Sequence, residues 1–64
     1  MNITILKRLQ NREFTNIWNV GSDYEEYVIY WNDGTKSSIT EKQFNDILNI
    51  DEQLYDEINI ALQN

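Results

Sequence analysis

The residues of this chain that could do chemistry are mainly carboxylates, and they are densest near its end. Asp51, Glu52, Asp56 and Glu57 are close in sequence, and Glu52 and Asp56 are four residues apart. On a helix this spacing places side chains on the same side. Such an acidic stripe could imitate phosphates in a basic groove of another protein, hold a weakly bound cation, or simply face solvent. The spacing of a calcium-binding EF-hand loop is absent.

A second acidic group consists of Asp23, Glu25 and Glu26, at the expected tip of a hairpin. Paired carboxylates can act as general acid and base in glycoside hydrolysis. That chemistry needs an enclosed sugar site, and an exposed loop of so short a chain does not enclose one. We therefore interpret this group as an acidic surface patch.

The sequence lacks the residues that other kinds of catalysis require. The sequence contains no Cys and no His, which excludes disulfides, thiolate nucleophiles, imidazole bases and soft-metal sites. Ser37 and Ser38 have no convincing base to activate a hydroxyl. We expect no enzymatic activity, no cofactor and no metal.

The charge of the chain favours basic partners. The formal net charge is −6, although the basic residues Lys7, Arg8 and Arg12 gather near the start. Most of this surface repels a phosphate backbone and attracts proteins with basic surfaces. Nucleic acid is therefore an unfavoured partner. The alternative is that −6 is ordinary solubility charge for a small domain.

Aromatic residues offer a second candidate surface. Tyr30 and Trp31 end an apolar run, and such rings can stack on bases when Lys or Arg residues hold the phosphates. Here the neighbours are Glu25, Glu26 and Asp33. The aromatic side chains are therefore expected either in the core or on a protein-binding surface.

These residues need a scaffold, and 64 residues allow a single domain, residues 1–64. Alternation along the chain predicts a strand over 14–20. Residues 35–39, which return after the Asp33-Gly34 turn, predict a short strand that is polar enough to be an edge. Residues 26–31 are apolar on both faces, which predicts a central strand covered on both sides. Residues 3–10 fit either a strand or a helix, and we favour a strand.

The Asp33-Gly34 dipeptide predicts a two-residue hairpin turn. In that register Val28 lies opposite Ile39, and the preceding turn places Trp18 opposite Val28. Trp18, Val28 and Ile39 then share a face. A slip of one residue in either turn would exchange the faces. The opposite face would hold Ile17, Tyr27, Ile29 and Trp31.

Two helices should follow the strands. Thr40 and Gln43 match a capping box, and Asn49 can end the first helix. The second helix should begin near Asp51, whose acidic first turn suits the helix dipole. Every fourth residue from Ile50 onward is apolar and should face the sheet: Ile50, Leu54, Ile58 and Leu62. The expected fold is α+β, a small antiparallel three- to four-stranded meander followed by two short C-terminal helices packed on the sheet.

The sequence thus favours a non-enzymatic, acidic protein-interaction module. It could be an antagonist (inhibitor) or adaptor that binds a basic protein surface. Abundant Asn and Ile with no Pro suggest a low-GC bacterium or its phages. One alternative is a structural homodimer or accessory subunit with an aromatic interface, and another is a nucleic-acid-binding module that uses the sheet and the basic N-terminus. The candidate partner-binding residues are Asp51, Glu52, Asp56, Glu57, Glu25, Glu26, Tyr30 and Trp31.

The expected location is the cytoplasm. Lys7 and Arg8 follow the first apolar residues, whereas a signal peptide has its charges before the apolar stretch. No apolar run approaches the roughly 20 residues that cross a bilayer.

Overall fold

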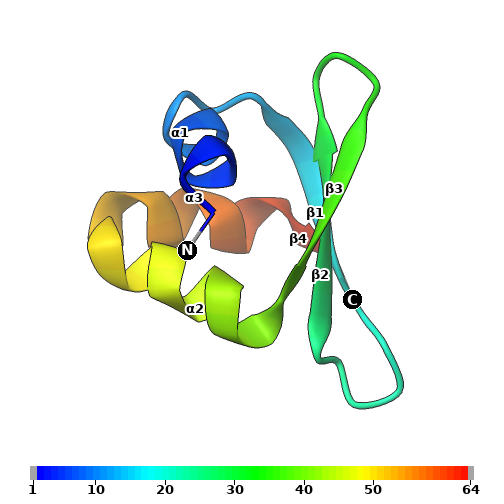
Figure 1. Ribbon diagram of the computed structural model, residues 1–64. Helices are drawn as coiled ribbons and strands as arrows, with labels where there is room; N and C mark the ends of the chain where they lie inside the picture. The colour runs from blue at the N-terminus through cyan, green and yellow to red at the C-terminus, as the bar shows by residue number, and fades with distance from the viewer. Residues whose placement is uncertain (1, 64) are drawn as a thin grey trace.

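The structure, a computed structural model, describes residues 2–63 and has an α+β fold. Strands β1, β2 and β3 form an antiparallel meander, and a short β4 pairs in parallel with β1, so that the strand order is β3-β2-β1-β4. All three helices lie on one face of this sheet (Figure 1). The predicted meander followed by two helices is confirmed. The elements are α1 (Ile3–Gln10), β1 (Phe14–Val20), β2 (Glu26–Trp31), β3 (Lys36–Thr40), α2 (Glu41–Ile50), α3 (Glu52–Ala61) and β4 (Leu62–Gln63).

The first segment is a helix, so the strand that we favoured for residues 3–10 is wrong. The side chain of Asn2 caps α1 by accepting a hydrogen bond from the Ile5 N–H at 3.1 Å. Ile5 and Leu9, four residues apart, are both buried in the core. Leu6 packs against the same core. A helix brings all three residues to one side, whereas a strand would place Ile5 and Leu9 on one face and Leu6 on the other.

The register between β1 and β2 agrees with the prediction, and the register between β2 and β3 does not. Trp18 pairs with Val28, as expected. Val28 pairs with Ser38, however, and Ile39 pairs with Tyr27. The slip of one residue moves Ile39 from the face of Trp18 to the buried face, because successive side chains of a strand alternate.

The cause of this slip is a longer hairpin loop. The Trp31 N–H donates to the Thr35 carbonyl at 2.9 Å, and the Gly34 N–H donates back to the Trp31 carbonyl at 3.1 Å. Gly34 has a φ of +87°, and neither Asn32 nor Asp33 has a positive φ. This is a three-residue loop in which a left-handed glycine follows a turn, rather than a two-residue turn with two left-handed residues.

The core lies between the helices and one face of the sheet. The rings of Tyr27 and Phe44 stack there, with centroids 3.9 Å apart. Burial, together with the nearby negative charge of Glu41, raises the pKa of Tyr27. The buried residues are Ile5, Leu9, Ile17, Ile29, Trp31, Ile39, Phe44, Ile47, Leu54 and Ile58.

No helix of the described residues 2–63 lies over the other face of the sheet (Figure 1), so the expectation that β2 is covered on both sides is wrong. The central position of β2 in the sheet is confirmed by its pairing with both β1 and β3. Trp18 and Tyr30 on the uncovered face are 40% and 37% exposed.

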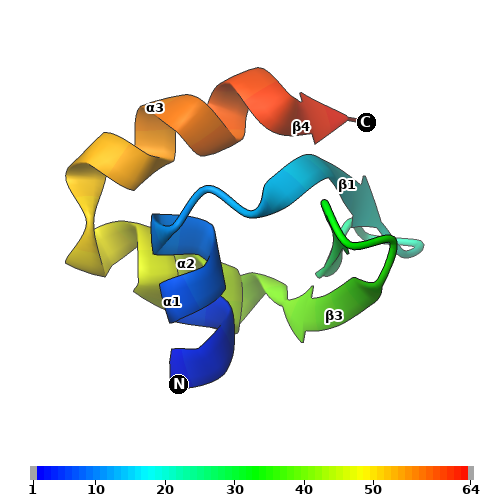
Figure 2. The ribbon, with the colours of Figure 1, turned by 90° about the horizontal axis from the view of Figure 1, so that it is seen from above.

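The C-terminal helices begin as predicted and end differently. The capping box is present, because Thr40 and Gln43 each accept a hydrogen bond from the other's backbone N–H at 3.2 Å. Helix α2 continues past Asn49 to Ile50, which is 53% exposed rather than buried. Helix α3 ends before Leu62, which belongs to β4 and pairs with Ile17 of β1. Figure 2 shows α3 leading directly into β4. None of the helices described between residues 2 and 63 is long and apolar enough to cross a membrane.

Candidate functional site

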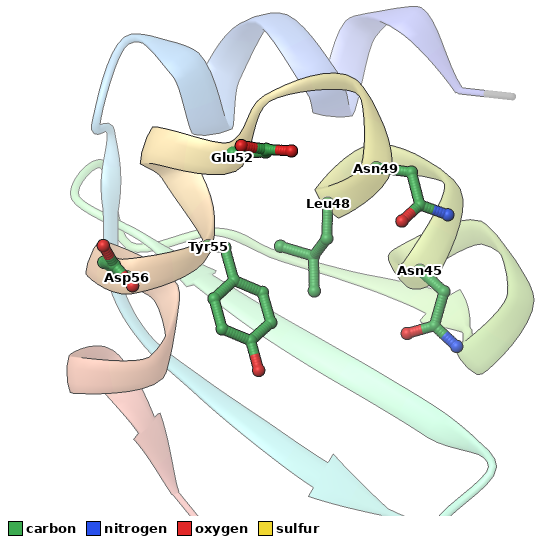
Figure 3. Close-up of a pocket in the computed structure, with 6 residues that line it drawn as sticks. All are labelled: Asn45, Leu48, Asn49, Glu52, Tyr55 and Asp56. Carbon is green, nitrogen blue, oxygen red and sulfur yellow. The ribbon is translucent and has the colours of Figure 1, made fainter.

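A groove of about 690 Å³ lies along α2 and α3, the helices that carry the acidic cluster (Figure 3). Each helix supplies three residues with the same spacing, i, i+3 and i+4, because these positions share one side of a helix. The pattern on both helices is polar, apolar, polar. The lining residues are Asn45, Leu48 and Asn49 from α2, and Glu52, Tyr55 and Asp56 from α3.

The two sides of the groove differ in chemistry. The α2 side presents the amide groups of Asn45 and Asn49, which can donate and accept hydrogen bonds. The α3 side presents the carboxylates of Glu52 and Asp56, which only accept when ionised. Between these sides lie Leu48 and Tyr55, whose side chains come close to each other in Figure 3.

The carboxylates of the groove carry uncompensated charge. Neither Glu52 nor Asp56 forms an ion pair with another residue of the described range 2–63. Both are exposed, and the exposed fraction of Tyr55 is 49%. The arrangement suits a ligand that combines a cationic donor for the carboxylates with an apolar group for Leu48 and Tyr55.

The other two acids of the predicted stripe have structural partners. Asp51 is the N-cap of α3, where its side chain accepts a hydrogen bond from the Leu54 N–H at 3.3 Å. The carboxylate of Glu57 forms an ion pair with the guanidinium of Arg12. The predicted set of four acids therefore divides in two, and only Glu52 and Asp56 line the groove.

The remaining predicted residues lie elsewhere. The carboxylate of Glu25 accepts a hydrogen bond from the Asp23 N–H at 3.0 Å and so belongs to the hairpin tip. Glu26 and Tyr30 are on the uncovered face of the sheet. Trp31 is 2% exposed, and its indole N–H donates to the Ser37 hydroxyl at 2.8 Å, so it is a core residue.

Two of the three basic residues near the start, Arg8 and Arg12, are engaged within the chain. Arg8 donates to Glu13 at 3.1 Å and to Asp33 at 3.2 Å, while Arg12 pairs with Glu57. Phosphate contacts by Arg8 or Arg12 would have to replace these ion pairs. This feature weakens the case for a nucleic-acid-binding module.

Four of the six groove residues were not among the predicted site residues: Asn45, Leu48, Asn49 and Tyr55. The repeated i, i+3, i+4 pattern on adjacent helices is the signal that could have identified them. Among residues 2–63, no group of three or more acidic side chains is placed to hold a metal ion.

Comparison with known proteins found no matching family model, no matching curated protein and no matching solved structure.

Proposed function

We propose that this protein is a non-enzymatic interaction module whose α2–α3 groove binds a basic segment of a partner protein. The observation that carries the proposal is the position of Glu52 and Asp56, exposed acids without an internal cation, beside the apolar pair Leu48 and Tyr55. Opposite charge at this site would accelerate association and select basic partners. The net charge of −6 acts in the same direction at longer range.

The geometry favours one kind of segment. Leu48 and Tyr55 can accept an apolar anchor from the partner, and Glu52 with Asp56 can pair with Lys or Arg on one side of that anchor. Asn45 and Asn49 can satisfy polar groups on the other side. An amphipathic helix that carries Arg and Leu at i, i+4 spacing has this combination.

A module of this kind would act as an antagonist or adaptor. If the basic surface of the partner normally binds phosphates, Glu52 and Asp56 would occupy the same cationic groups and exclude them. The origin in a low-GC bacterium or phage and the cytoplasmic location, both expected from the sequence, stay predictions.

The test is an NMR titration with a defined peptide. A synthetic amphipathic helix of Arg and Leu should shift the side-chain amide signals of Asn45 and Asn49 and the ring signals of Tyr55. The same peptide with Glu in place of Arg should not. Higher salt should weaken binding, because screening acts on exposed charges.

A matched pair of variants separates the groove from the overall charge. Glu52→Gln with Asp56→Asn should weaken peptide binding by about tenfold, as expected for loss of close charge pairs. Asp23→Asn with Glu26→Gln removes the same charge away from the groove and should have a much smaller effect. Equal losses in the two double variants would mean that the groove is not the binding site.

A further inference from the structure

The uncovered face of the sheet forms a regular three-by-three array, which we call the open face. Its rows follow directly from the register of β1, β2 and β3. The first row is Asn16, Tyr30 and Lys36, the second is Trp18, Val28 and Ser38, and the third is Val20, Glu26 and Thr40.

The open face is apolar at its middle and balanced in charge. Trp18 and Tyr30 are 40% and 37% exposed, and Val28 lies half-buried beside Trp18. Only Glu26 and Lys36 are charged among the nine residues, and they have opposite signs. The whole chain, in contrast, has a net charge of −6. Two copies therefore repel each other over most of their surface, but not where two open faces meet.

The positions of the two charges are self-complementary. Glu26 lies in the third row and Lys36 in the first, on opposite sides of the row that contains Trp18. A two-fold axis that runs across the strands along the middle row exchanges the first and third rows. Glu26 of one copy then lies above the row that contains Lys36 of the other, and each Trp18 approaches its counterpart.

We propose that the open face binds a second copy of this chain, so that two sheets pack face to face in a symmetric dimer. Such packing places sheets about 10 Å apart, within reach of side chains from both copies. A two-fold contact uses the same surface on both subunits, which suits a surface complementary to itself. A basic protein or a nucleic acid would find no net negative or positive charge on this face.

The size of the open face determines the expected strength of self-association. Three strands about 4.8 Å apart, each contributing five residues with a rise of about 3.3 Å per residue, give roughly 240 Å² in projection. Standard interfaces bury about 800 Å² of each partner. We therefore expect a reversible dimer that forms at micromolar to millimolar concentration, with the α2–α3 groove of each copy left on the outside.

Sedimentation equilibrium of the full chain between about 10 μM and 1 mM tests the proposal, a range that covers such affinities. Lys36→Glu alone and Glu26→Lys alone should each weaken self-association by about tenfold, since like charges then meet. An equimolar mixture of the two variants should recover association, because each supplies the charge that the other needs.

A control pair of single variants has the same net charges with the changes placed elsewhere. Lys42→Glu and Asp23→Lys carry the same charge changes but lie outside the open face, so each alone should self-associate nearly as the wild type does. The proposal is overturned if the wild type stays monomeric to 1 mM. It is equally overturned if the open-face variants associate like the wild type, or if the control variants lose as much self-association as the open-face variants do.

A second measurement does not depend on any variant. The two indole N–H signals serve as probes in one molecule, because Trp18 lies on the open face and Trp31 is buried. On raising the concentration of wild-type protein, the Trp18 signal should shift and the Trp31 signal should stay in place. Equal shifts, or a shift of Trp31 alone, would contradict the proposed interface.

Discussion

The guanidinium of Arg8 lies over the ring of Trp31, with its carbon Cζ 4.2 Å from the ring centroid. Arg8 belongs to α1 and Trp31 ends β2, so this contact joins the first helix to the central strand. The same guanidinium binds Glu13 and Asp33. A planar group with several donors can make all these contacts at once, which a lysine ammonium cannot do.

Arg8→Ala should destabilise the protein by about 1–2 kcal/mol, because it removes the cation–π contact and two partly exposed ion pairs. Arg8→Lys should recover only part of that loss. Urea unfolding followed by tryptophan fluorescence measures both. Lys7→Ala is the matched control, since Lys7 is exposed and forms no ion pair within residues 2–63. Equal stability of the Arg8→Ala and Lys7→Ala variants would show that α1 is held by its apolar residues alone.

Substitutions of Gly34 test the three-residue hairpin loop. A Cβ at this position meets no atom within 4 Å, so the cost of a side chain comes from the φ of +87° alone. We expect Gly34→Val to cost well over 1 kcal/mol, Gly34→Ala about 1 kcal/mol and Gly34→Asn less, because Asn tolerates the left-handed region best. Thermal unfolding gives the ranking. A valine variant as stable as the wild type would refute this loop geometry.

Substitutions of Asp51, Glu52 and Asp56 test whether Asp51 has a structural role that the two groove acids lack. Asp51→Ala should cost about 1 kcal/mol, because it removes the N-cap of α3, while Asp51→Asn should cost little, because Asn caps as well as Asp. Glu52→Gln with Asp56→Asn should leave stability nearly unchanged, since exposed charges contribute little to folding. Chemical unfolding at neutral pH distinguishes these cases. An Asp51→Ala variant as stable as the wild type would show that Asp51, like Glu52 and Asp56, does not stabilise the fold.

Asp33 makes part of the stability depend on pH. Its carboxylate accepts hydrogen bonds from the Thr35 hydroxyl at 2.5 Å and from the Thr35 N–H at 2.9 Å. These bonds, with a smaller contribution from Arg8, lower the pKa of Asp33. The folded state therefore favours the ionised form. This stabilisation is complete above the ordinary aspartate pKa of about 4 and is lost as pH falls through the lower folded value.

Asp33→Asn should accordingly lose less stability than the wild type when the pH is lowered from 5 to about 2. Thermal unfolding over this pH range provides the comparison, and the two proteins should converge at the acidic end. Asp23→Asn controls for removal of an exposed aspartate. If Asp33→Asn followed the wild-type curve throughout, the Thr35 contacts would not couple to the charge.

Local chemistry made several elements predictable. The capping box of Thr40 and Gln43, the start of the last helix near Asp51 and the pairing of Trp18 with Val28 all follow from neighbouring residues or from one tight turn. Residues 3–10 were ambiguous because the same apolar residues fit both the period of a helix and the alternation of a strand. Packing of Leu6 against the same core as Ile5 and Leu9 fits a helix, because a strand would turn Leu6 to the opposite face.

The candidate site was predictable in part. The sequence showed that Glu52 and Asp56 share one side of a helix, and it identified Tyr30 as a possible surface aromatic residue. It could not show that Arg12 neutralises Glu57, because these residues are 45 positions apart. Nor could it show that Trp31 is buried while Tyr30 is not, since both belong to a strand that is apolar throughout.

Composition and short-range pattern by themselves determined an acidic α+β domain without cysteine or histidine, with its strands before its last two helices. The tertiary structure decided which side chains of β3 lie on the covered face of the sheet, through a hairpin loop one residue longer than expected. That added residue moved Ile39 into the core and left Ser38 beside Val28. Because side chains alternate along a strand, a difference of one residue in a loop determines which residues are core and which remain for binding.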